Sequence, residues 1–143
     1  MLRIKYLVVV LLVAILGSIM LYNANIGKVD WSFTEWKDRM VEKSASVILV
    51  SDGQPKSIIV VADKPKEAAK LAALELQSWL YKSSGVVVPI LHEHQVPRHM
   101  SNNPDDTLIL VGDTKYTAEL GIESKNFELE EIRICAFPAI LVI

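Results

Sequence analysis

The longest apolar stretch of the sequence runs from Tyr6 to Tyr22 and contains no charged residue. Its seventeen residues would span ~26 Å as a helix, close to the ~30 Å hydrocarbon core of a bilayer. Arg3 and Lys5 lie just before this stretch, and basic residues favour the cytoplasmic side of a membrane. The pattern therefore predicts that residues 6–22 contact the lipid bilayer as a single span. The amino end would be cytoplasmic, and the remainder would be exported to the periplasm or the outside.

The same stretch can be interpreted as a retained anchor or as a cleaved signal peptide. A cleavage site has small residues at its last position and two positions earlier. A site ending at Ala24 would place Tyr22 at the earlier position. A site ending at Gly17 would place Ile15 there. Both residues are too bulky, so an anchor is favoured; cleavage would instead give a secreted domain.

A helix-start signature follows the apolar stretch. Ser32 can cap a helix in which Trp36 is the fourth residue, and Trp31 precedes the cap. These tryptophans occupy the two positions of a hydrophobic staple. The signature predicts a short amphipathic helix over Ser32–Lys43. The tryptophans would pack together or lie at a membrane interface, with carbohydrate stacking as the alternative.

Two apolar segments then flank a turn-forming sequence. Val47–Val50 and Ser57–Ala62 are rich in the β-branched residues that favour strands. Between them, Ser51–Pro55 contains Asp, Gly and Pro, which are typical of turns. These segments are therefore predicted to form a β-hairpin.

The best-defined predicted element is a helix that is capped by Asp63 or Lys64 and runs to about residue 83. One arc of this helix is apolar at the helical period. Leu71 and Leu74 fall outside the arc, which indicates a second apolar neighbour or exposure. The residues on the arc are Ala69, Ala72, Ala73, Leu76, Trp79 and Leu80.

The rest of the pattern predicts shorter elements. Pro89 argues for an edge position of the strand at Val86–Leu91, and the unbroken apolar run Thr107–Val111 predicts a central strand. The polar residues 92–106 predict a long loop. The remaining predicted elements are a short helix from Gly112 to Gly121, an extended segment over Phe127–Ala136 and a strand over Ala139–Ile143.

These elements predict an α+β fold with two layers. A mixed β-sheet would carry the principal helix and the short second helix on one side, preceded by an N-terminal transmembrane helix. The predicted parts are an anchor or signal (1–27), a juxtamembrane segment with a short helix (28–45), and an α+β domain (46–143). The last five residues are all apolar. Their strand must therefore lie inside the sheet, or the chain is a fragment truncated at its C-terminus.

Composition narrows the class of partner. About 120 residues follow the predicted anchor, which is enough for one domain. Residues 47–143 carry nine basic and thirteen acidic side chains with no basic stripe, so we expect no nucleic acid partner. The single cysteine cannot form an internal disulfide, so core burial must hold the domain together.

Several segments between Ile58 and Ile134 follow one another in a recognisable order. They are Ile58–Ala62, Ala68-Ala69, Leu74–Leu80, Ser84-Gly85, Val88–Ile90, Leu108–Thr114, Glu119–Ile122 and Glu131–Ile134. This order resembles the non-catalytic N-terminal domain of α-glucuronidases and the related chitobiase-type domain that precedes the barrel of β-hexosaminidases. The resemblance covers about two-thirds of the predicted exported part. It implies a small α+β domain that abuts a (β/α)₈ barrel, where the catalytic carboxylates lie.

The barrel is absent from this sequence, so the resemblance assigns no catalytic residue to the chain. It leaves a catalytic barrel on another chain, or on a continuation of this one, as the expected partner besides the bilayer.

All the histidines, namely His92, His94 and His99, lie within eight residues. With Glu93 they could offer imidazole and carboxylate ligands to a metal such as zinc. A polar loop that happens to be rich in histidine is the favoured interpretation. We therefore predict no metal site here.

The triplet Gly112-Asp113-Thr114 lies where a strand passes into a helix and could meet an anion at the helix N-terminus. One glycine is far short of a phosphate loop, and Asp113 would repel phosphate. Helix capping by Asp113 or Thr114 is therefore the favoured role.

Two further groups have ordinary explanations. Glu128, Glu130 and Glu131 could suggest the paired carboxylates of a glycosidase, but solvated strand residues are the favoured interpretation. Cys135 has no adjacent histidine and is predicted to be buried filler rather than a nucleophile. The sequence thus predicts no catalytic, cofactor-binding or metal-ligating residue and no cofactor.

Three hypotheses for function follow. The first is a membrane-tethered, exported accessory domain of the glycoside-hydrolase type, linked to carbohydrate metabolism and not catalytic by itself. The second is a fragment of a glycoside hydrolase whose barrel is missing. The third is an independent module that binds carbohydrate or protein.

Overall fold

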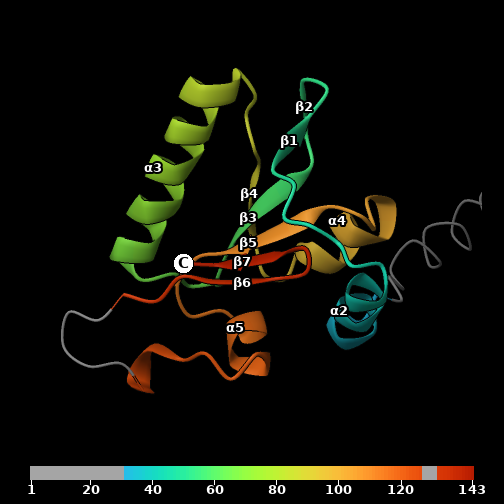
Figure 1. The fold of residues 1–143 in the computed structure, drawn as a ribbon. Helices are drawn as coiled ribbons and strands as arrows, with labels where there is room; N and C mark the ends of the chain where they lie inside the picture. Colours follow the sequence, from blue (N-terminus) through green and yellow to red (C-terminus); the bar gives the residue numbers. More distant parts are fainter. Residues whose placement is uncertain (1–30, 127–131) are drawn as a thin grey trace, which may run out of the picture. The chain divides into compact units, whose positions relative to one another are not determined.

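The computed structural model describes residues 31–126 and 132–143 (Figure 1). These residues belong to one compact unit, Trp31–Ile143. The predicted membrane-spanning segment lies outside the described residues. Within the described part of the chain, no helix combines the length and apolar character needed to cross a bilayer.

The unit is built on a five-stranded mixed sheet, as expected for a mixed α+β fold. Four neighbouring strands run parallel, and the fifth pairs antiparallel at one edge. Three predictions of strand position are confirmed: the strand around residues 107–110 is central, the strand that ends near residue 91 is at an edge, and the C-terminal strand lies inside the sheet. From edge to edge the strands are β4 (Ile90–His92), β3 (Ser57–Val61), β5 (Thr107–Leu110), β7 (Ile140–Val142) and β6 (Cys135–Phe137).

The two inner strands β3 and β5 are buried over their whole length. Their sequences, SIIVV and TLIL, are continuous apolar runs after a single polar residue. Such runs are typical of parallel strands that are covered on both faces. Ile58 and Leu108 pair in register and point to one face, whereas Ile59 and Ile109 pair and point to the other.

One face of the sheet is covered by α3 (Glu67–Ser84). This helix confirms the predicted principal helix, although Lys66 rather than Asp63 or Lys64 occupies its N-cap position. Ala73 is its one fully buried residue. Ala69, Leu76 and Leu80 are partly buried against the sheet, as their arc predicts. Ala72 and Trp79 lie at the margin of that arc and are exposed, Trp79 by 67%, so the predicted burial of these two residues is wrong.

The opposite face is covered by three helices, α2 (Phe33–Glu42), α4 (Val96–Asn102) and α5 (Lys115–Glu119). The prediction of two layers with both helices on one side is therefore wrong. Strand β4 lies on one side of β3 and β5 on the other, so successive crossovers run in opposite directions. Crossovers of the same hand then place α3 and α4 on opposite faces. Figure 1 shows α3 on one side of the sheet and the other helices across from it.

Helix α2 begins as its sequence predicts. The hydroxyl of Ser32 accepts a hydrogen bond from the backbone N–H of Glu35, and the rings of Trp31 and Trp36 lie 6.2 Å apart. Trp36 is 1% exposed and donates its indole N–H to the carbonyl of Pro104 at 2.8 Å. The helix therefore shares one core with the sheet, which favours packing as the role of this tryptophan.

The hairpin prediction is confirmed only in part. The turn forms between β1 (Val50–Ser51) and β2 (Gln54–Pro55), which pair antiparallel. β3, however, pairs in parallel with β4 and β5 rather than with the first segment. The run of β3 is apolar on both faces, so it belongs in a covered parallel sheet and not in a two-stranded ribbon.

A 3₁₀ turn, η1 (Ser124–Asn126), follows α5.

Gly112 permits the close approach of β5 to α3. It has φ +71°, and a Cβ atom added to it would lie 2.9 Å from the Cβ of Ala69. Gly121 has a similar φ of +73° but no atom within 4 Å of the added Cβ. A side chain at either glycine would strain the backbone, but only one at Gly112 would also overlap α3. Comparing substitutions at the two positions therefore distinguishes the two costs.

We expect Gly121→Ala to lower the free energy of unfolding by about 1–2 kcal/mol, the usual cost of a left-handed residue with a side chain. Gly112→Ala should cost measurably more, because it adds overlap with α3. Urea unfolding followed by tryptophan fluorescence measures both variants. Equal losses would show that this contact does not constrain the fold.

Candidate functional site

The carboxyl ends of β4, β3, β5 and β7 meet at one edge of the sheet, because these strands are parallel. The chain leaves β3 toward α3 on one face and leaves β5 toward α5 on the other. In open parallel sheets, ligand sites form at the point where neighbouring connections diverge in this way. The residues that follow these strands are therefore the candidate site, and we call them the carboxyl edge.

Asp63, after β3, is held by His94, after β4. One carboxylate oxygen of Asp63 accepts the backbone N–H of His94 at 3.1 Å and lies 2.6 Å from its Nδ1. Since a carboxylate only accepts, Nδ1 carries the donated proton. The side-chain hydrogen bond from His94 is the main reason why the pKa of Asp63 lies below its usual value.

Glu93 joins the segments that follow three strands. Its carboxylate accepts the backbone N–H of Asp63 at 3.3 Å and that of Lys115, the first residue of α5, at 2.7 Å. Its backbone carbonyl accepts the hydroxyl of Tyr116 at 3.1 Å. Burial raises the pKa of Tyr116, with a smaller effect from the charge of Glu93, so this hydroxyl stays protonated as a donor.

The histidines have separate partners. The rings of His92 and His94 lie 6.0 Å apart and nearly parallel, and Nδ1 of His92 donates to the carbonyl of Ala62 at 2.9 Å. His99 lies on α4, where its Nε2 is 2.9 Å from a carboxylate oxygen of Asp106. Among the described residues no group of three His, Cys, Asp or Glu is arranged to hold a metal ion.

The predicted long loop over 92–106 is wrong where α4 forms. Its first turn contains Pro97, which a helix tolerates at its start because the first backbone N–H groups have no intrahelical partner. Val96 and Met100 bury completely on the sheet side of this short helix.

The Gly112-Asp113-Thr114 junction is a cap, as favoured. The Thr114 hydroxyl accepts the backbone N–H of Thr117, and the Thr117 hydroxyl in turn accepts the backbone N–H of Thr114. Asp113 accepts hydrogen bonds from the backbone and hydroxyl of Ser124 and from Nζ of Lys66 at 3.1 Å. The bonds from Ser124 come first among the causes that lower the pKa of Asp113.

Two other predicted candidates have different outcomes. The cluster Glu128, Glu130 and Glu131 lies outside the described residues. Cys135 lies in the edge strand β6 and is half-buried rather than buried, because an edge strand is covered less completely than a central one.

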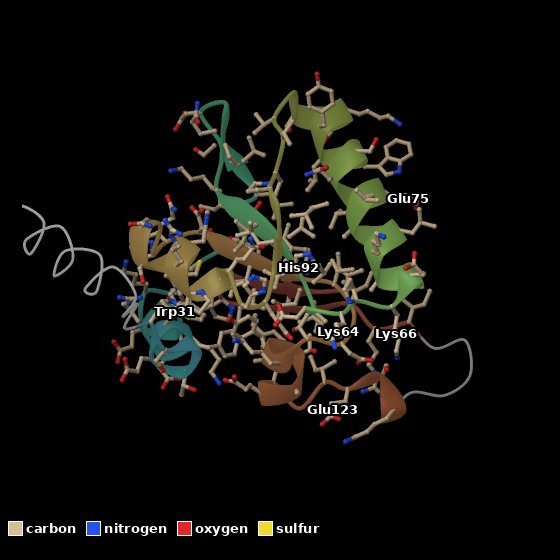
Figure 2. All side chains as sticks on the ribbon, turned by 180° about the vertical axis from the view of Figure 1, so that it is seen from behind. Trp31, Lys64, Lys66, Glu75, His92 and Glu123 are labelled. Carbon is tan, nitrogen blue, oxygen red and sulfur yellow. The ribbon has the colours of Figure 1, made fainter. Side chains whose placement is uncertain are left out.

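Two grooves flank α3 on its face of the sheet. One has a volume of about 540 Å³ and lies between the first half of α3 and the ends of β5 and β7. Its walls include the side chains of Ala68, Ala72 and Ile143, with Lys64 and Lys66 at the start of the helix (Figure 2). The other, of about 450 Å³, lies between α3 and β4 and includes Leu74 and His92. Both volumes fall in the range of small-ligand sites.

In comparisons with known proteins, no family model, no curated protein and no solved structure matches the chain.

The sequence predicted that the polar residues 92–94 follow a strand, but not that Glu93 and His94 reach Asp63. The signal that could have found them is topological. Asp63 and Glu93 each follow an apolar run, and two parallel neighbouring strands bring such residues to one edge.

The Asp63 bond predicts a specific loss of stability in acid. Because the pKa of Asp63 is lower in the folded state, its contribution is fully present above the unfolded pKa of about 3.9 and disappears as the pH falls through the folded value. We expect wild type to be more stable than Asp63→Asn at about pH 6. That difference should vanish toward about pH 2, as measured by urea unfolding at each pH.

Asp52→Asn is a matched control, because Asp52 is exposed and lies in the β1–β2 turn. A difference between wild type and Asp63→Asn that stays constant across this pH range would contradict the assigned bond.

Proposed function

We propose that this chain is a membrane-tethered, exported accessory domain related to the N-terminal domain of α-glucuronidase-type glycoside hydrolases. It acts by packing against or positioning a catalytic partner and performs no catalysis itself. Its partners are the bilayer, through residues 6–22, and a catalytic barrel domain. The order of segments between Ile58 and Ile134 is the basis for the class.

One observation supports the proposal that this chain is not catalytic. The carboxylates of the carboxyl edge are engaged in bonds that connect its loops. Asp63 bonds to His94, Glu93 bonds to the backbone of Lys115, and Asp113 bonds to Ser124 and Lys66. A general acid or nucleophile must instead reach the reacting atoms of a substrate. These carboxylates therefore favour a structural role.

The exposed surface of α3 supports the proposal that the domain packs against a partner protein. Leu71, Leu74 and Trp79 are more than half exposed on a helix that has one fully buried residue. Large exposed apolar side chains that gather on one element are typical of surfaces that meet another protein.

The grooves beside α3 favour a second candidate, an independent module that binds carbohydrate or protein. The larger groove combines apolar walls with the charged side chains of Lys64, Lys66, Arg133 and Asp113, of which Lys66 and Asp113 pair with each other. This combination suits a ligand that has both a polar and an apolar side. Saturable binding of a sugar in this groove by the intact chain would favour the module over the accessory domain.

The proposal predicts that the intact chain is inert toward glycosides. Membranes that contain the full chain are incubated with 4-nitrophenyl glucuronide and with 4-nitrophenyl N-acetylglucosaminide. They are also treated with a fluoroglycosyl fluoride that traps glycosidase carboxylates. We expect no nitrophenol above that from membranes lacking the chain, and an unmodified mass for the protein.

A carboxylate labelled by the probe would contradict the absence of catalysis. The same membranes test the tether, because an anchored chain stays in the pellet after an alkaline carbonate wash. Release of the chain into the wash would contradict the membrane anchor. The absence of catalysis is tested separately, by the glycoside and probe assays.

A further inference from the structure

The outward surface of α3 carries a regularly spaced row of four residues, three of them large and apolar and one a serine. Leu71, Leu74, Ser78 and Tyr81 follow one another at spacings of three, four and three residues. This is the spacing of the a and d positions of a coiled coil. We call these four residues the outer seam of α3.

The large apolar residues of the outer seam are more than half exposed, and Leu74 also lines the groove beside β4. Leu71 is 58% exposed, Leu74 is 51% exposed and Tyr81 is 54% exposed. The sheet-facing side of the helix is formed instead by Ala69, Ala73 and Leu76, together with Leu80. Apolar residues thus occupy two opposite sides of one helix, and among the described residues only one side packs against the core.

The charges beside the seam discriminate between possible arrangements. Lys70 precedes the first seam residue and Glu75 follows the second, so they occupy the g and e positions. In a parallel pair of helices, a residue at g meets the residue at the following e position of the other helix. Lys70 of each copy would therefore face Glu75 of the other. Figure 2 shows Glu75 on the side of α3 turned away from the sheet.

An antiparallel pair lacks this complementarity. Glu75 lies next to the middle of the seam, so two antiparallel copies would bring their Glu75 side chains together. Like charges at such a contact are destabilising. The charge pattern therefore fits a parallel second copy of this chain better than an antiparallel one.

We propose that two copies of this chain associate through the outer seam of α3, with the helices parallel and Lys70 paired with Glu75 of the second copy. The seam spans about three helical turns, so the interface is small and the association reversible. This inference goes beyond the accessory role proposed above, and it assigns Leu71 and Leu74 of the exposed α3 surface to contact with a second copy of the chain.

Charge reversal and exchange test the pairing. The full chain is studied by sedimentation equilibrium in a density-matched nonionic detergent. Wild type should be in monomer–dimer equilibrium. Glu75→Lys should raise the dissociation constant of the dimer about tenfold, because two attractive pairs become repulsive. The double variant Lys70→Glu/Glu75→Lys should return the dissociation constant to the wild-type value, because the opposite charges face each other again. Glu119→Lys on α5 should leave the dissociation constant unchanged.

A second measurement tests the parallel orientation independently. In a Cys135→Ser background, Ser78→Cys should form a disulfide-linked dimer under mild oxidation, because the two copies of residue 78 face each other across a parallel seam. Ala118→Cys on α5 is the control and should remain monomeric.

Three results would overturn the proposal. The first is a wild type that stays monomeric at its highest soluble concentration. The second is a double variant that associates no better than Glu75→Lys. The third is cross-linking of Ser78→Cys no faster than that of Ala118→Cys. Matching circular dichroism spectra across the variants exclude misfolding as the cause.

Discussion

The structure depends on two parallel strands that are buried on both faces. Residues 58–61 of β3 and 108–110 of β5 are at most 3% exposed, and each large side chain among them contributes about 1.5–3 kcal/mol of transfer free energy. A parallel sheet of this kind must be covered on both sides. That requirement places α3 on one face and α2, α4 and α5 on the other. The parallel direction of the strands also brings their carboxyl ends, and hence Asp63 and Glu93, to one edge of the sheet.

The two faces are not covered equally. Three helices share one face, whereas α3 alone lies on the other and leaves a groove on each of its sides. The carboxylates of the carboxyl edge are engaged in holding its loops. The proposed functions follow from this contrast. In these proposals the carboxyl edge has a structural role, and the surface of α3, where Leu71, Leu74 and Trp79 are exposed, meets a partner.

Local signals in the sequence were enough for the elements with strong periodicity or caps. The apolar run 107–111, the helix around Ala73 and the Ser32 and Thr114 caps were all predicted, because each depends on neighbours within a few residues. Helix α4 was missed, since only Val96 and Met100 mark its buried side and Pro97 resembled a loop residue. The bonds of Glu93 were missed because they join residues 22 and 30 positions apart. Such pairs become visible only once the order of the strands is known.

Hydrogen exchange of the full chain tests the central constraint most directly. The backbone N–H of Ile59 bonds to the carbonyl of Pro89, and that of Val111 bonds to the carbonyl of Val60, each at 2.9 Å, in the interior of the sheet. If β3 and β5 form a core covered on both faces, these amides exchange only through global unfolding and are among the slowest in the protein. Exchange at Ile59 and Val111 as fast as at Gln54, in the exposed β1–β2 hairpin, would contradict a sheet covered on both sides.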